Sequence, residues 1–422
     1  MRLVIVLILS ALAAGCVTTR TPHVCLTALQ AQKFGQYDTA LLHYESCLAD
    51  SSLSPRARAA AHLARGSVQA KKQNYDAAIA DLNIAAKSPA LSRKSQASAH
   101  IALGSIYRSK AQYDDAFANL NKAVEITPDN YLAYQARGRA YRQSGQFDEA
   151  IQDFTKAIEI EPEKSGLYNL RALTYNQRGD LVAGTRDFEK AIETDTKPGW
   201  IYYNRSLQHT KSKNFAAALE DQEKMQRLAP GDWKIHVARG QTFMWMGQYE
   251  KSIHELNKIP EPLFDFFALD DRGLIFFLQN HLEDAVRDLT RASTKKKDRD
   301  PKIARWLFLA KLKSGKDGTS DLRKSLAETS GTEWQKDILR FLLGDKSEED
   351  LFAATKIKYK STESLRMCQA NYVAGTIQYI KGNRARALTL LRASANATPP
   401  VCFESIAAEA EIKRITQIAP GI

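Results

Sequence analysis

The sequence has 422 residues with 44% hydrophobic and 26% charged side chains, and its formal net charge is +12 at pH 7. This length excludes a single compact core and suits either several domains or an array of repeats in which each unit packs only on its neighbours. The positive charge favours anionic partners, such as acidic protein surfaces, lipid headgroups or acidic polymers, without choosing among them.

The chain begins with a short apolar segment. Met1 and Arg2 precede an apolar run over residues 3–9, and small residues then lead directly into Cys16. The run is too short to span a bilayer, and its charged start and small-residue end are typical of an export signal. This export segment also argues against nucleic acid as the partner of the positive charge.

The position of Cys16 makes the segment resemble a bacterial lipoprotein signal. The resemblance implies a signal peptide over residues 1–15, lipidation of Cys16 and a tether over 16–23. Val17 differs from the Asp that typically retains lipoproteins in the inner membrane, so an outer-membrane anchor facing the periplasm is expected. Several acyl chains give stable membrane attachment where one chain is marginal. The alternative is an ordinary secretory signal in which Cys16 is incidental.

Four further cysteines remain after Cys16, an even number that suits disulfides in an oxidising compartment. Cys25 lies early in one predicted helix and Cys47 lies late in the next, and a turn at Gly35-Gln36 brings these ends together. Cys368 and Cys402 would begin two successive first helices of repeats, close enough to pair only if a helix end is distorted. For both pairs the alternative is small buried thiols.

A pattern with a period of 34 residues occupies the middle of the chain. A small residue is followed by an aromatic residue or His three positions on, an aromatic residue or Leu nine on, and another small residue twelve on. A fixed period of this length predicts a solenoid of helix-turn-helix units. The small residues that open the pattern are Gly104, Gly138, Ala172, Ser206 and Gly240.

The units start near residues 97, 131, 165, 199 and 233, and further units precede and follow them. Prolines close several units, where one helix must stop before the next begins. These residues resemble the tetratricopeptide repeat over 24–295. The resemblance implies an all-α, right-handed superhelical solenoid of helix-turn-helix repeats. Such arrays offer a long binding surface and usually no catalytic pocket.

Opposite charges recur together within the units, counted with residues 97 and 131 as position 1. Position 7 is Arg in the same units in which position 23 is acidic, and antiparallel helices bring these positions together. We therefore predict partly buried structural ion pairs. The alternative, a phosphate-binding stripe, is disfavoured by the acidic partners. The predicted pairs are Arg65–Asp81, Arg137–Asp153, Arg171–Asp187, Arg205–Asp221, Arg239–Glu255 and Arg272–Asp288.

The resemblance further implies that ligands lie in a concave groove lined by the first helix of each unit. Its early part is polar, suited to a peptide backbone or a carboxylate, and its later part is rich in aromatic anchors. Several of the apolar residues could instead pack against a C-terminal segment that folds back. The candidate binding residues are Arg108, Gln135, Arg139, Arg142, Asn169, Asn176, Trp200, Tyr203, Met244, Trp245 and Phe277.

The repeat pattern weakens after residue 292, and a charged run ending in Pro301 predicts a solvated connector rather than a basic docking site. We assign residues 296–422 to a C-terminal helical region with a degenerate repeat near Gly375. A final helix over 403–418 would cap the open end of the solenoid.

Residues 330–415 resemble the C-terminal part of lipoproteins of the NlpI type, outer-membrane adaptors that hold cell-wall hydrolases and a protease. The array in front is longer here, which leaves the identity of the partner open. The residues that carry the resemblance are Trp334, Phe341-Leu342-Leu343-Gly344, Glu348 to Leu351, Cys368-Gln369-Ala370-Asn371-Tyr372, Gly375 and Ala407 to Glu411.

Motifs of hydrolases, nucleotide-binding proteins and metalloenzymes do not occur, so no enzyme activity, cofactor or metal site is expected. The leading hypothesis is a lipid-anchored periplasmic scaffold that binds envelope proteins or peptides, such as cell-wall hydrolases or a regulating protease, in its groove. One alternative is a structural subunit of an envelope machine for pilus assembly or polysaccharide export. The other is a binder of anionic cell-wall polymer.

Overall fold

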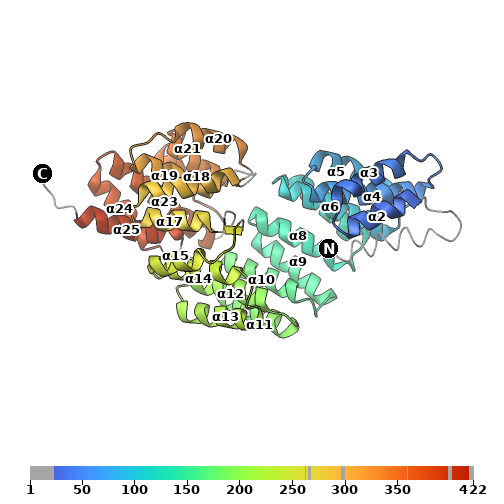
Figure 1. Ribbon diagram of the computed structural model, residues 1–422, viewed down its shortest axis with the longest axis horizontal. Coiled ribbons are helices and arrows are strands. Elements are labelled where there is room, and N and C mark those ends of the chain that lie inside the picture. Colours follow the sequence, from blue (N-terminus) through green and yellow to red (C-terminus); the bar gives the residue numbers. More distant parts are fainter. Residues whose placement is uncertain are drawn as a thin grey trace. The chain divides into compact units, whose positions relative to one another are not determined.

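The computed structural model describes residues 23–261, 263–264, 268–295, 300–329, 331–358, 360–397 and 402–417. These residues form helices joined by short loops (Figure 1), which agrees with the predicted all-α fold. The predicted signal peptide and Cys16 lie outside the described residues. Within the described ranges, no helix combines the length and the apolar character that crossing a bilayer requires.

The chain divides into two compact units, 1–174 and 175–422, with the division inside α10 (Ser165–Arg178). In the first unit each odd-numbered helix packs against the helix before it as an antiparallel hairpin, and successive hairpins stack through α3·α4, α5·α6 and α7·α8. Its helices are α2 (His23–Lys33), α3 (Tyr37–Ala49), α4 (Pro55–Lys71), α5 (Tyr75–Lys87), α6 (Arg93–Ser109), α7 (Tyr113–Ile126), α8 (Tyr131–Ser144) and α9 (Phe147–Ile160).

The small residues of the 34-residue pattern mark the closest approach within each hairpin. A Cβ atom added to Gly138 would lie 2.9 Å from the ring of Phe154, and one added to Gly104 would lie still closer to Leu120. Because a larger side chain would push the two helices apart, packing requires glycine here. The turn after α8 needs glycine for a different reason, since Gly145 has φ +85°.

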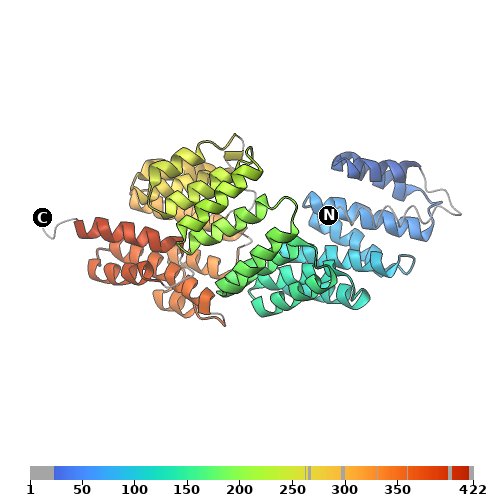
Figure 2. The same cartoon turned by 90° about the horizontal axis from the view of Figure 1, so that it is seen from below.

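The second unit continues with more helical pairs and then the C-terminal helices. Its bounds are α11 (Leu181–Thr194), α12 (Gly199–Lys211), α13 (Phe215–Leu228), α14 (Lys234–Trp245), α15 (Tyr249–Leu256), α17 (Leu269–Leu278), α18 (Leu282–Lys295), α19 (Pro301–Lys313), α20 (Thr319–Glu328), α21 (Glu333–Leu343), α22 (Glu348–Ala353), α23 (Lys360–Ile380), α24 (Arg384–Ala395) and α25 (Phe403–Gln417). Figure 2 shows α24 and α25, in red, side by side.

Helices after residue 295 share one core with the repeats before them. Trp306 of α19 is fully buried, and its ring lies 5.2 Å from Phe277 of α17, 5.2 Å from Tyr372 of α23 and 5.3 Å from Phe403 of α25. Residues on both sides of the predicted division at 295/296 thus belong to one hydrophobic core, and the division between repeat array and C-terminal region stays a prediction. The core is shared because the C-terminal helices bury their apolar faces against α17 and its neighbours.

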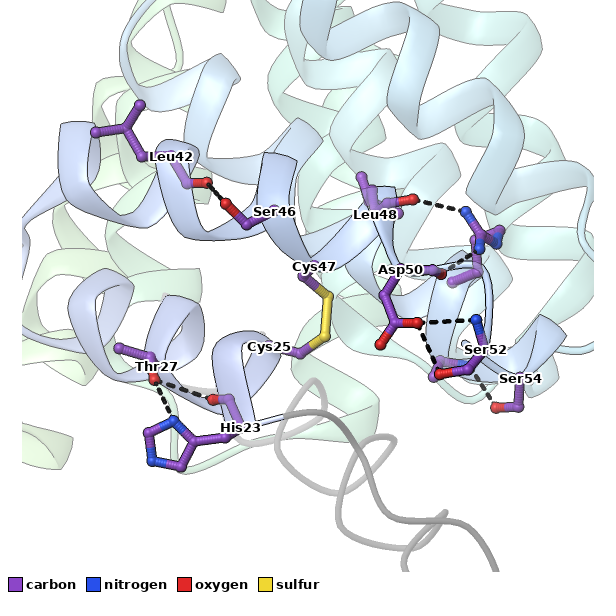
Figure 3. Close-up of a disulfide and its surroundings, with 12 residues drawn as sticks. His23, Cys25, Thr27, Leu42, Ser46, Cys47, Leu48, Asp50, Ser52 and Ser54 are labelled. Atoms are coloured by element: carbon purple, nitrogen blue, oxygen red, sulfur yellow. Dashed lines mark hydrogen bonds between the residues drawn. A yellow bond between two sulfur atoms is a disulfide. The ribbon is translucent and has the colours of Figure 1, made fainter.

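Both predicted cysteine pairs form disulfides. Cys25, in the first turn of α2, joins Cys47, near the end of α3, across a Cα–Cα distance of 5.1 Å (Figure 3). Cys368 and Cys402 have a Cα–Cα distance of 6.4 Å. The prediction that Cys368 begins a helix is wrong, because α23 begins at Lys360 and Cys368 therefore lies inside that helix. Cys402 directly precedes α25, as expected.

Candidate ligand-binding face

Buried carboxylates hold one set of arginines in place. Arg65 donates two parallel hydrogen bonds to Asp81, from Nε to Oδ2 at 2.7 Å and from Nη2 to Oδ1 at 2.8 Å. The hydrogen bonds and the charge of Asp81 raise the pKa of Arg65. These arginines are committed to the scaffold and are unavailable to a ligand. The same arrangement recurs at Arg137–Asp153 and Arg205–Asp221, and Arg272 donates to Asp288 at 2.6 Å.

The predicted pair Arg239–Glu255 is wrong. Arg239 donates to Gln226 at 2.7 Å, whereas Glu255 accepts from Lys258 at 2.7 Å and pairs with His236 at 2.8 Å. Glu is one methylene longer than Asp, so its carboxylate is placed differently from those of the other units. Arg171 lies in the first unit and Asp187 in the second, and that pair stays a prediction.

Position 4 supplies a third member of these ion pairs that the sequence reasoning missed. His62 lies 2.8 Å from Asp81, and His236 contacts Glu255 in the same way. Where position 4 is Tyr, the guanidinium lies over its ring instead, 5.7 Å from the centroid at Tyr134 and 5.5 Å at Tyr202. The recurrence of His or Tyr at one position in successive units is the signal that could have found it.

A second set of arginines has a different environment. We call Arg108, Arg139 and Arg142 the arginine cluster. Arg139 and Arg142 lie on α8, as does the paired Arg137. Because a helix turns about 100° per residue, the side chains of Arg139 and Arg142 point away from that of Arg137 and lie about 60° from each other around the helix axis. Arg108 holds the position of Arg142 one repeat earlier, on α6, which packs against α8.

No carboxylate among the described residues is paired with a guanidinium group of the cluster. Among the described residues none of the three forms an ion pair, and Arg108 donates to the side chain of Gln143 at 2.7 Å. Desolvation by the surrounding protein lowers the pKa of Arg139 and of Arg142, and the positive charges of the neighbouring arginines lower both further. The cluster therefore concentrates positive charge that the described part of the fold does not neutralise.

The cluster is accessible to solvent. Arg139 is exposed, and Arg108 and Arg142 are half-buried. Gln135, half-buried, lies seven residues before Arg142 and hence on the same face of α8.

Aromatic residues lie next to the cluster. The ring of Phe117 is stacked on that of Tyr141, with centroids 4.5 Å apart, and Tyr113 follows at 6.5 Å from Phe117. The Tyr113 hydroxyl donates to the backbone carbonyl of Gln143 at 3.4 Å, and burial raises its pKa. Tyr113 lies beside Arg108, whereas Tyr141 lies on the side of α8 that carries Arg137, whose guanidinium is 6.0 Å from the Tyr141 ring centroid. The face of the cluster thus combines cations and amides with the ring of Tyr113.

Three of the candidate binding residues are buried and do not belong to an accessible face. Asn169 is 5% exposed, Met244 3% and Phe277 1%. Phe277 is covered by Trp306 and by Lys313, whose Nζ lies 4.9 Å from its ring centroid. For Phe277 the physical reason is that α19 packs on α17, which is the alternative that the sequence leaves open.

The other candidates of the second unit have partners within it. Trp200, 37% exposed, donates from its indole nitrogen to Asp195 at 3.0 Å, and Asn176 donates to Gln208 at 2.6 Å. Trp245 packs, partly buried, against the core. Burial and two nearby aspartates raise the pKa of Tyr203 to about 12. These contacts leave the arginine cluster as the accessible charged site.

Within the described residues, no three His, Cys, Asp or Glu side chains gather closely enough to hold a metal ion. The arrangement offers hydrogen-bond donors, positive charge and aromatic surface, which are means of recognition.

Comparison with known proteins identifies the repeats. Two family models described as tetratricopeptide repeat match this chain, one over residues 95–163 and the other over 25–92 and 136–199. No match was found among curated proteins.

Solved structures of repeat proteins are similar to the chain. A crystal structure of a tetratricopeptide repeat protein from Parabacteroides merdae ATCC 43184 has a TM-score of 0.50 and 19% identity, and the match covers 59% of this chain and 97% of that chain. MamA from AMB-1 matches with a TM-score of 0.34 and 25% identity over 41% of this chain and 98% of its own.

YrrB, described as a tetratricopeptide repeat protein with an unusual peptide-binding site, matches with a TM-score of 0.33 and 21% identity over 43% of this chain and 90% of its own. The Parabacteroides structure supports the fold, and the family models identify the repeat. The chain therefore contains tetratricopeptide repeats, which build protein–protein interaction scaffolds, within an all-helical fold.

Proposed function

We propose that this protein is a lipid-anchored scaffold on the periplasmic side of a bacterial outer membrane, where its repeats bind envelope proteins or peptides. Tetratricopeptide repeats bind peptides and proteins in general. Features of this chain support the other parts of the proposal, which are the compartment, the lipid anchor and the class of partner.

The two disulfides are the observation that carries the proposal. Cys25–Cys47 closes the first hairpin, and Cys368–Cys402 links α23 to the start of α25. All four cysteines are buried. Structural disulfides persist in oxidising compartments and are rare in the cytosol. The pairing thus fits a protein that is exported, as the apolar segment over residues 3–9 also predicts.

The anchor rests on Cys16 and on the resemblance of residues 1–15 to a lipoprotein signal. Attachment to a membrane confines the repeats to a thin layer and raises the effective concentration of bound partners there, so modest affinities suffice. The resemblance of residues 330–415 to lipoproteins of the NlpI type favours cell-wall hydrolases or a protease as partners.

The location is tested by expressing the full chain in a Gram-negative bacterium beside a Cys16→Ser variant. We expect the native chain to incorporate labelled palmitate and to fractionate with outer membranes, and the variant to do neither. Thiol labelling of the denatured native chain should increase after reduction. A native chain that stays in the cytosol, with all its thiols reactive before reduction, would contradict the proposal.

The scaffold role is tested by crosslinking in the same cells. We expect defined envelope proteins to be recovered with the native chain and to dissociate from it reversibly. Recovery of cell-wall polymer alone, lost steeply with added salt, would instead support direct binding of an anionic polymer. An isolated chain that is unstable without a fixed partner would support a subunit of an envelope machine.

A further inference from the structure

We propose that the arginine cluster, Arg108, Arg139 and Arg142, recognises an acidic peptide segment that carries at least two carboxylates. This inference rests on the proposed scaffold function and names the chemistry of its ligand. Its evidence is the contrast between two sets of arginines on the same repeats.

The first step concerns charge. Arg137 and Arg139 are two residues apart on α8, yet Arg137 donates two hydrogen bonds to Asp153 while Arg139 has no carboxylate partner among the described residues. Each guanidinium has five N–H donors, so the bond from Arg108 to Gln143 leaves most of the donors of the cluster for a ligand. Like charges on a desolvated face repel one another, so a bound anion would relieve this repulsion.

The second step concerns access. The corresponding face of the later repeats is occupied by the protein's own helices, because Phe277 is buried beneath Trp306 and Arg414 of α25 donates to the carbonyl of Leu278. Arg139, in contrast, is exposed. Among the described candidates, Met244 and Phe277 are thus closed to a ligand, whereas the arginine cluster has an exposed member.

The third step concerns the shape of the ligand. The cluster draws on two successive repeats, with Arg108 on α6 and Arg142 on α8, and its three charges exceed what a single carboxylate neutralises. Gln135, one to two turns before the arginines on the same face, offers an amide suited to a peptide backbone. Arginine binds carboxylates through two parallel hydrogen bonds. An extended peptide with spaced carboxylates matches this arrangement better than a small anion.

The test uses the full chain, a fluorescent peptide of alternating Glu and Gly, and its counterpart with Gln in place of Glu. Fluorescence anisotropy should detect binding of the Glu peptide and little binding of the Gln peptide. We expect Arg142→Gln to weaken binding of the Glu peptide about tenfold, which corresponds to about 1.4 kcal/mol. Arg142→Lys should restore part of the affinity, since Lys keeps the charge but loses the planar geometry.

The matched control is Arg56→Gln, which removes one positive charge at an exposed site on α4 outside the cluster. We expect it to weaken binding by less than about twofold at physiological salt, because exposed charges at a distance are screened. Equal losses from Arg142→Gln and Arg56→Gln would overturn the proposal, as would equal binding of the two peptides. Displacement of the peptide by millimolar inorganic phosphate would also overturn it in favour of a small-anion site.

This inference and the scaffold function fail in different ways. If Arg142→Gln captures the same envelope proteins in cells as the native chain, the scaffold function stands and the arginine cluster is not its binding site. If the native chain captures none, the scaffold function fails whatever the peptide measurement gives.

Discussion

Replacing Arg137 by Met should destabilise the helices around it, whereas the same change at Arg139, two residues away on α8, should not. Arg137 donates two hydrogen bonds of 2.8 Å to Asp153 and one of 2.9 Å to Asn121 of the preceding repeat. It thus joins three helices. Arg139 is exposed and pairs with no carboxylate among the described residues.

The size of the effect follows from the burial of Asp153, whose side chain is 7% exposed, beside 19% for Arg137. Removing one partner of a buried pair costs about 3–5 kcal/mol because the other charge is left unpaired. Arg137 retains some contact with water, so we expect a cost at or just below the lower end of this range, about 2–3 kcal/mol. Loss of Arg139 relieves like-charge repulsion and should leave stability unchanged or slightly raised.

Backbone hydrogen exchange of α8 and α9 is the appropriate assay, because a repeat array opens locally and a single global unfolding energy is not well defined. Protection factors in Arg137→Met should fall by about 30-fold to 140-fold relative to the native chain, as 1.4 kcal/mol is a factor of ten. If Arg137→Met and Arg139→Met reduce protection equally, the division into structural and ligand-binding arginines is refuted.

Three further predictions follow from the packing, the disulfides and the buried carboxylates. Gly138→Val should lower the hydrogen-exchange protection of α8 and α9 by an amount equivalent to about 1–3 kcal/mol, because its Cβ would meet an aromatic ring at 2.9 Å, whereas Gly166→Ala, with nothing within 4 Å, should not. Cys25→Ser combined with Cys47→Ser should lower the stability of α2 and α3 by about 2–4 kcal/mol, seen as faster proteolysis there with the remaining helices protected. Burial raises the pKa of Asp81, but hydrogen bonds from Arg65 and His62 outweigh it and hold this pKa below its usual value. Ionised Asp81 therefore stabilises the fold at any pH above the ordinary carboxyl pKa. This stabilisation is lost as the pH falls through the pKa of Asp81 in the folded state. Asp81→Asn should therefore be less stable than the native chain at pH 7, and the difference in stability should shrink as the pH falls below the ordinary carboxyl pKa; a difference that does not shrink in acid would contradict this.

Features set by the two helices of one repeat are predictable from the sequence. The 34-residue period determines which residues face each other across a hairpin, so the sequence alone pairs Arg65 with Asp81. The turn at Gly35 places Cys25 beside Cys47 for the same reason. Local rules suffice in such cases because each repeat contacts mainly its neighbours.

Features set by distant segments are not predictable in this way. Met244 and Phe277 lie on the first helices of their units. The 34-residue period does not predict which other helices pack on these first helices. The helices that cover them are held by contacts between residues almost a hundred positions apart, such as Arg305 with Glu404 and Lys313 with Glu411. Such contacts depend on tertiary packing rather than on the repeat.

Side-chain length sets another limit. A carboxylate at position 23 is not sufficient for pairing, since Glu255 binds His236 and Lys258 and leaves Arg239 to Gln226. The repeat pattern predicts an acidic residue at position 23. Whether that residue forms a bidentate ion pair with Arg also depends on the length of its side chain. The arginine cluster is separable from the paired arginines by sequence because its members do not occupy position 7, the position that faces the carboxylate at position 23.

Photocrosslinking in living cells tests the central claim most directly, that the repeats hold acidic segments of envelope proteins at the arginine cluster. A photoreactive amino acid replaces Gln135, beside the cluster, in the native chain, in Arg142→Gln and in Arg56→Gln. We predict adducts to envelope proteins at acidic segments in the native chain and in Arg56→Gln, and their loss in Arg142→Gln. Adducts of equal yield in all three, or none in any, would contradict the claim.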